Sequence, residues 1–201
     1  MENNRRSFIK KLGVAGATAA IIPSSFASET KPVNLLNRQT KFTGNKTLNI
    51  ALIGAGGMGV ADTTTALSHD NINLLAVCDL YDGRLEESKQ RWGNSLFVTK
   101  DYKEILKRSD IDAVIIGTPD FWHKKMSIDA LNAGKHVYCE KPMVHSVEEG
   151  NDIIKAWKKS GKIYMVGSQG MSSLGNEKAK ELLAAGAIGT LNYAEGFWAR
   201  N

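Results

Sequence analysis

Short apolar runs alternate along this chain with longer segments in which apolar residues recur at helical spacing. The continuous runs predict buried strands, and they cover residues 48–53, 72–78, 96–98, 113–116, 136–139 and 163–166. The segments between them predict helices, and these cover residues 58–68, 82–92, 101–108, 121–133, 147–160 and 176–185. Such repeated alternation implies parallel strands joined by crossover helices. We therefore expect an α/β fold with a doubly wound parallel sheet.

A further strand pattern covers residues 191–198, close to the last residue of the sequence. No later strand follows with which it could pair. We therefore expect it to be the first strand of a second, truncated α+β domain. The parallel-sheet domain would then occupy residues 47–170, and residues 171–201 would begin the second domain.

The first 27 residues have the pattern of an export signal. A basic start precedes an apolar run at 12–22, too short for the ~20 residues that span a bilayer core. Arg5 and Arg6, followed in register by Phe, an aliphatic residue and Lys, resemble the twin-arginine motif of the bacterial Tat pathway. We expect export to the periplasm or beyond through the Tat machinery, with residues 28–46 as a linker. The alternative for the first 27 residues is a disordered basic tail.

Net charge bears on nucleic acid as a partner, and the cysteines bear on whether the chain forms a disulfide. The formal net charge is +5, of which residues 1–27 carry +3, so the remainder gives no argument for nucleic acid as a partner. Cys78 and Cys139 each end an apolar run. We expect two buried free thiols rather than the disulfide that an exported protein could form. No residue pattern predicts a metal site.

A glycine-rich turn joins the first predicted strand to the first predicted helix. Gly54, Gly56 and Gly59 form the pattern G-x-G-x-x-G, in which the first glycine permits the tight turn. The second lets the backbone approach a pyrophosphate, and the third lets helix and strand pack closely. The amides of Gly57 and Met58 open the helix, where an anion is favoured. The turn predicts a Rossmann dinucleotide site; a turn that only reverses the chain, a flavin or a nucleotide sugar are the alternatives.

Asp79 ends the second predicted strand, 20 residues after Gly59. A carboxylate at this position can accept hydrogen bonds from the adenosine ribose hydroxyls and repels a 2′-phosphate. We therefore expect NAD as the cofactor. Arg84 keeps NADP as the alternative, because a nearby arginine can accommodate that phosphate.

Two later segments, residues 117–123 and 134–142, lie at further strand ends, where ligands bind in such sheets. In and around them the chain contains T-P-x-x-x-H at 118–123, A-G-K-H-V at 133–137 and E-K-P at 140–142, after the glycine turn and before Val166-Gly167-Ser168-Gln169. This ordered set resembles the N-terminal half of the Gfo/Idh/MocA oxidoreductase family over residues 47–201. The resemblance implies a cofactor-binding half whose catalytic acid/base, substrate pocket and homo-oligomer interface lie mostly in a C-terminal domain beyond Asn201.

The resemblance also implies roles for single residues. Lys141 corresponds to the lysine of E-K-P, close to the nicotinamide and the substrate hydroxyl. An ammonium there can stabilise a developing alkoxide and relay a proton, whereas the plain alternative is a solvated lysine after a strand. The remaining cofactor contacts that it implies are Thr118, Pro119 and His123 on the cleft wall, Glu140 at the nicotinamide ribose and Gln169 at the nicotinamide end. For His123 a capping or packing role is the alternative, and Asp120 is expected as a helix N-cap.

The function expected from these residues is hydride transfer between nicotinamide C4 and a carbinol carbon of a sugar or polyol. Export implies a cofactor that stays bound, because free NAD is not expected outside the cytoplasm. Two alternatives remain open. One is an NAD-dependent glycoside-cleaving enzyme on the same fold, and the other is a dinucleotide-binding sensor without activity.

Overall fold

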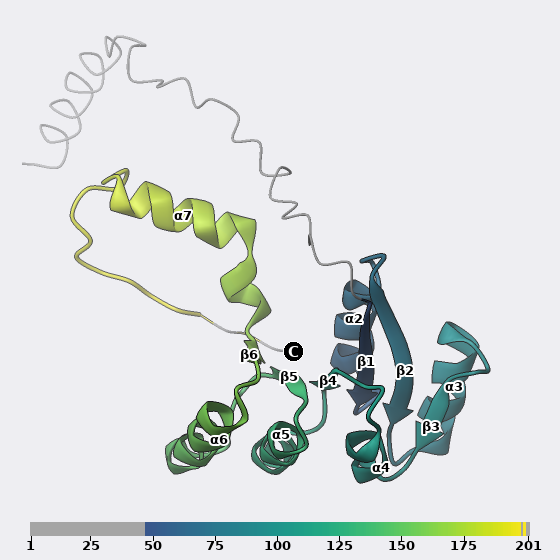
Figure 1. The fold of residues 1–201 in the computed structure, drawn as a ribbon. Coiled ribbons are helices and arrows are strands. Elements are labelled where there is room, and N and C mark those ends of the chain that lie inside the picture. The colour runs from purple at the N-terminus through teal and green to yellow at the C-terminus, as the bar shows by residue number, and fades with distance from the viewer. Residues whose placement is uncertain (1–46, 198, 200–201) are drawn as a thin grey trace, which may run out of the picture. The chain divides into compact units, whose positions relative to one another are not determined.

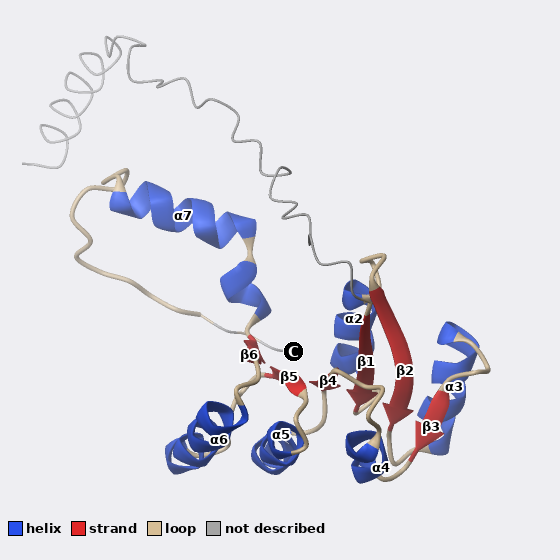
Figure 2. Cartoon of the chain, in the orientation of Figure 1, coloured by secondary structure: helices blue, strands red, loops and turns tan. Residues whose placement is uncertain are grey.

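The computed structural model describes residues 47–197 and 199, which contain a parallel sheet. Six strands stand in the order β3-β2-β1-β4-β5-β6 (Figure 2). Their bounds are β1 Leu48–Ile53, β2 Ile72–Cys78, β3 Phe97–Thr99, β4 Ala113–Ile116, β5 His136–Glu140 and β6 Tyr164–Gly167. The predicted doubly wound α/β fold is confirmed, and every strand of the sheet lies within one residue of its expected bounds.

The helices connect successive strands, as the alternating pattern predicts (Figure 1). Their bounds are α2 Gly57–Ala66, α3 Asp82–Trp92, α4 Tyr102–Lys107, α5 His123–Asn132, α6 Val147–Ser160 and α7 Leu174–Ala184, with 3-10 helices η3 Asp120–Trp122 and η4 Gln169–Ser172. Left-handed glycines follow α5 and α6, at Gly134 and Gly161. Among the helices in the described part of the chain, none is long and apolar enough to cross a bilayer.

The sheet is buried on both faces, which explains the unbroken apolar runs of its central strands. In β1, Ala51 and Ile53 join an apolar cluster that includes residues of α4, α5 and α6. Ile50 and Leu52 point the other way and join a second cluster that includes residues of α2 and α3. Both faces of β1 are thus covered by helices.

The order of the strands reverses at β1, which places a crevice at the carboxyl ends of β1 and its neighbours. Ile53, the last residue of β1, lies between Cys78 of β2 and Ile116 of β4. The three residues that come next, Gly54, Asp79 and Gly117, are therefore brought together although they are far apart in sequence.

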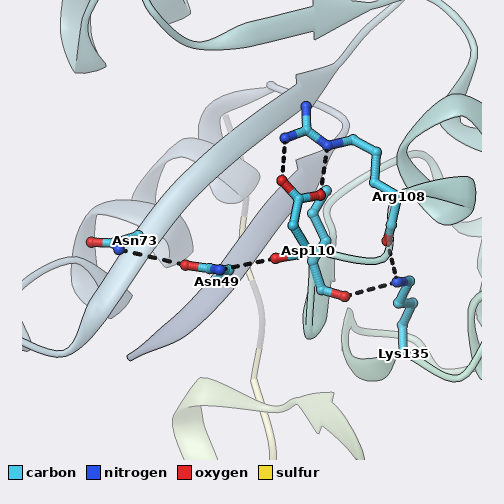
Figure 3. A network of polar contacts seen from close by, with 6 residues as sticks. Asn49, Asn73, Arg108, Asp110 and Lys135 are labelled. Atoms are coloured by element: carbon cyan, nitrogen blue, oxygen red, sulfur yellow. Dashed lines mark hydrogen bonds and ion pairs between the residues drawn. The ribbon is translucent and has the colours of Figure 1, made fainter. Parts of the chain in front are cut away.

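A polar network closes the opposite, amino ends of the strands (Figure 3). The buried Lys135 donates from Nζ to the carbonyl oxygens of Arg108 at 2.5 Å and Ile111 at 2.8 Å. Asn49 donates from Nδ2 to the carbonyl oxygen of Asp110 at 2.9 Å, and the Asp110 carboxylate pairs with Arg108. The lysine of A-G-K-H-V thus holds strand ends together, at the edge of the sheet away from the crevice.

Three segments differ from their expected structure or lie outside the described residues. Residues 191–197 form no strand, because a strand needs a partner for its backbone groups and no segment in the described part of the chain pairs with them. The helix expected over 121–133 is divided into η3 and α5, so Asp120 begins a 3-10 turn and does not cap α5. The expected signal peptide and linker, residues 1–46, lie outside the described residues, and the domain boundary at 171 stays a prediction.

The two cysteines behave as predicted. Cys78 and Cys139 are both buried and free. Each lies near the carboxyl end of its strand, inside the cluster that α4, α5 and α6 cover.

Candidate functional site

A cavity of about 500 Å³ opens at the carboxyl ends of β1, β2 and β4. It is lined by residues that follow each of these strands, and of the expected cofactor residues it includes Gly54, Asp79, Arg84, Thr118 and Pro119. Leu80, Tyr81, Phe121 and Trp122 complete much of its apolar wall and were not assigned from sequence. The signal that could have found them is position, because each lies within a few residues of a strand end.

The glycine turn is shaped by close packing of backbone against backbone. Gly54 has φ +92°, and a Cβ on it would lie 2.8 Å from the carbonyl carbon of Gly117. A Cβ on Gly117 would in turn lie 2.7 Å from Cα of Gly59. Both distances are far below those of real contacts. A Cβ on Gly59 would in the same way overlap the carbonyl oxygen of Gly54, so all three positions require glycine. The roles expected for Gly54 and Gly59 agree with this geometry, whereas Gly117 was not singled out from the sequence.

The start of α2 offers backbone donors to an anion. Gly56 precedes the helix, and the amides of Gly57, Met58 and Gly59 form its first turn, where N–H groups lack partners within the helix. A Cβ on Gly57 would meet nothing within 4 Å, and one on Gly56 would meet only Nη1 of Arg84, at 3.9 Å. The backbone is thus open to a phosphate on this side.

Asp79 is only 7% exposed, and its carboxylate joins two loops. Oδ2 accepts from the backbone N–H of Ala55 at 2.8 Å, and Oδ1 accepts from that of Tyr81 at 2.9 Å. Arg84 approaches Oδ2 with Nη1 at 3.4 Å and lies over the Tyr81 ring. A carboxylate has about four acceptor sites, so Asp79 can still accept from ribose hydroxyls.

His123 lies behind the cleft wall rather than in it. The side chain is 1% exposed, and Nε2 lies 2.9 Å from the carbonyl oxygen of Thr118 while Nδ1 lies 2.7 Å from that of Pro142. Burial disfavours a charged ring, but the Cys139 side chain and the two carbonyl oxygens together raise the pKa of His123 to about 9. The ring therefore links two loops, which agrees with the packing role left open from the sequence, and a direct contact with cofactor stays a prediction.

Glu140 ends β5 in a cluster of acidic and amide side chains. It is buried, and Gln169 donates from Nε2 to its Oε1. Asp62 of α2 faces the same carboxylate; burial and the Glu140 charge raise the pKa of Asp62 to about 6, against the opposing hydrogen bond from Gln169. Oδ2 of Asp62 is buried and has no hydrogen-bond partner among the described residues. No sequence pattern signals Asp62, which resembles an ordinary polar helix residue.

Lys141 follows Glu140 directly and is exposed. Within the residues that the structure describes, its ammonium has no ion-pair or hydrogen-bond partner, unlike the buried Lys135. The nearest structural link to the cofactor cleft is His123, because that ring contacts both Thr118 of the cleft and Pro142, the residue after Lys141. The His123 side chain thus links the main chain next to Lys141 with the cleft. No group of three His, Cys, Asp or Glu suited to a metal occurs in the described ranges.

The chain matches a known family of proteins. Residues 48–168 match the family model for Gfo/Idh/MocA, described as an oxidoreductase family with an NAD-binding Rossmann fold. The match covers more than half of the chain, so this protein belongs to the Gfo/Idh/MocA oxidoreductase family.

Relatives of differing activities share this domain. A glycosyl hydrolase family 109 protein of Shewanella baltica is 29% identical over 177 residues, which are 81% of this chain and 39% of the relative. The myo-inositol 2-dehydrogenase of Lactobacillus plantarum is 29% identical with a TM-score of 0.66, over 72% of this chain and 43% of that one. The WlbA dehydrogenase of Chromobacterium violaceum, solved with NADH and UDP-GlcNAcA, is 28% identical with a TM-score of 0.66, over 73% and 42%. This chain spans about two fifths of the length of such relatives.

Proposed function

We propose that this chain holds NAD in the cavity at the ends of β1, β2 and β4. It would serve an oxidoreductase that transfers hydride at a carbinol carbon of a sugar, polyol or sugar derivative. The observation that carries the proposal is the placement of Lys141, which has no partner among the described residues, at the end of the strand beside this nucleotide cleft.

The residues of the cleft fit NAD. The first-turn amides of α2 suit the pyrophosphate, and the openness at Gly56 lets it approach. The Asp79 carboxylate suits the two hydroxyls of the adenosine ribose and opposes a 2′-phosphate. Arg84 already contacts that carboxylate, which partly offsets its charge and leaves NADP as the competing cofactor.

The chemistry assigned to this chain concerns the proton and the orientation of the substrate. Bound NAD supplies the hydride acceptor. Lys141 would donate a hydrogen bond to the substrate hydroxyl and stabilise negative charge that develops on its oxygen. Glu140, held by Gln169, would orient the nicotinamide ribose. The group that finally takes the proton is not assigned to a residue of this chain.

A second candidate is glycoside cleavage with transient oxidation of the sugar and no net redox change. The observation that favours it is the 29% identity to glycosyl hydrolase family 109 proteins. The motif Glu140-Lys141-Pro142, whose lysine the family resemblance places close to the nicotinamide and the substrate hydroxyl, favours the dehydrogenase instead. The two share the same cofactor site and differ in their products.

The proposed function is tested on the full-length protein, purified natively and then denatured. We expect the released nucleotide to be NAD by mass spectrometry, in near-stoichiometric amount. Inositols, free sugars, nucleotide sugars and aryl glycosides are then assayed for NADH formation and for release of the aglycone. Oxidised sugar with reduced cofactor supports the dehydrogenase. Cleavage without net NADH supports the second candidate, and bound NAD without any turnover would indicate a sensor.

We also propose that residues 1–27 direct Tat export and that the cofactor is loaded before export. The test replaces Arg5 and Arg6 together by lysine, which keeps the charge of the segment unchanged. We expect the variant to stay in the cytoplasm with NAD bound, whereas the parent is found in the periplasmic fraction. Export of the lysine variant at the parent's level would contradict the proposal.

A further inference from the structure

The His123 ring joins the turn that lines the cofactor cleft to the segment that contains Lys141. One is the turn after β4, which contributes Thr118 and Pro119 to the cofactor cleft. The other is the segment after β5, where Pro142 follows Lys141. The two ring nitrogens lie 2.9 and 2.7 Å from the carbonyl oxygens of Thr118 and Pro142.

The two carbonyl oxygens decide how many protons the ring carries. A carbonyl oxygen only accepts hydrogen bonds, so each nitrogen that faces one must donate. A neutral imidazole has one N–H and one lone pair, and its lone pair would then face an oxygen at 2.7 or 2.9 Å. A rotated ring would place carbon atoms at these positions and lose both hydrogen bonds. Only the doubly protonated ring satisfies the geometry.

Burial and the dipole of α5 both oppose a charge on His123, and no carboxylate among the described residues acts on its pKa. The titratable side chain that acts on it is Cys139 of β5, and the other partners are the two carbonyl groups. His123 is also the first residue of α5, where the positive end of the helix dipole disfavours a cation. The charge is therefore held by the Cys139 side chain together with two oriented backbone dipoles, in a site from which water is excluded.

We infer that His123 is a positioning residue, held as an imidazolium, that fixes the Lys141 segment against the cofactor cleft. This inference rests on the proposed function, because the ring is inferred to set the distance between Lys141 and the bound cofactor. Loss of the second ring proton removes one of the two links. The turn after β4 and the segment after β5 then move independently.

The charge is tested directly on the full chain with 15N-labelled histidine. Both ring nitrogens of His123 are expected to show the chemical shifts of protonated nitrogens at pH 7.5 and to titrate only with a pKa of about 9. The signals are assigned by their loss in His123→Gln. A neutral tautomer at pH 7.5 would overturn the inference, and this result does not depend on whether the protein binds NAD.

The positioning role is tested by kinetics on the full-length enzyme. His123→Gln keeps a donor but cannot reach both carbonyls, so we expect kcat to fall about tenfold or more, with a smaller change in the Kd for NAD. The matched control is His69→Gln, in the exposed turn between α2 and β2, with unchanged kcat. Equal losses of kcat and NAD affinity in a folded His123→Gln would point to a merely structural ring and contradict the role. If neither parent nor variant bound NAD, the proposed function would fail while the 15N result would still decide the charge.

Discussion

Gly54 and Gly117 pack backbone against backbone across the carboxyl ends of β1 and β4, at a distance that leaves no room for a Cβ on either. A Cβ on Gly117 would also lie 2.7 Å from Cα of Gly59. The glycine turn is therefore completed by a residue 58 positions beyond Gly59, which no local pattern contains. The contact therefore predicts that a substitution at Gly117 disturbs the glycine turn.

Gly117→Ala is expected to destabilise the protein and to weaken NAD binding. The new methyl group must push α2 away from β4, and overpacking of this kind costs about 1–3 kcal/mol. Urea denaturation measures the free energy of unfolding. Gly57→Ala is the matched control, since a Cβ there meets nothing within 4 Å and the free energy of unfolding should not fall. Equal stability of Gly117→Ala and the parent would contradict the close packing of Gly117 against Gly59.

Lys141→Ala is expected to keep the bound cofactor and lose most turnover. The side chain is exposed and lacks a partner in the described residues, so its removal should leave the fold intact. Loss of one charged hydrogen bond to a developing oxyanion corresponds to about 100-fold or more in kcat. Lys158→Ala, on the exposed side of α6, serves as the control with parental turnover. Unchanged turnover in Lys141→Ala would remove this lysine from the reaction.

Asp79→Ser is expected to change cofactor preference and stability together. The substitution shortens the side chain and removes its charge, so the backbone N–H groups of Ala55 and Tyr81 lose their acceptors. A buried donor without a partner costs about 1–3 kcal/mol. Dissociation constants for NAD and NADP, measured by quenching of tryptophan fluorescence, should shift towards NADP because Arg84 is released. A pure change of preference at constant stability would show that the carboxylate does not join the two loops.

Asp62→Asn is expected to stabilise the protein above about pH 6. The folded pKa of Asp62 is raised to about 6 from an ordinary 3.8, so the folded state binds this proton more tightly than the unfolded state. The stability that it contributes is full below pH 3.8 and is lost as the pH rises through 6. Unfolding free energies from pH 4 to 8 should therefore diverge between parent and variant as the pH increases. Asp70→Asn, at an exposed turn, should run parallel to the parent throughout.

The sequence predicts the sheet well because its strands are local features. Each central strand is buried on both faces and so forms an unbroken apolar run that is recognisable by itself. The strand expected over 191–198 is not formed by its described residues, 191–197, because a strand needs a partner and an apolar pattern does not supply one.

The sequence predicts site residues only where a single segment of the chain contains the whole motif. The glycine turn and Asp79 belong to one βαβ unit, so their spacing identifies them. The pairing of Asp62 with Glu140 depends on how α2 packs near the end of β5, and nothing in the sequence around Asp62 signals it. The same holds for His123, whose two partners follow different strands.

The backbone contact among Gly54, Gly59 and Gly117 has a consequence for the thermodynamics of binding. This part of the cleft is built without side chains, so no rotamers need to be frozen there when a ligand arrives. Ordering a long side chain can cost about 1.5–2 kcal/mol of conformational entropy. The glycine turn has no side-chain rotamers to order, so the affinity for a dinucleotide is not reduced by this cost.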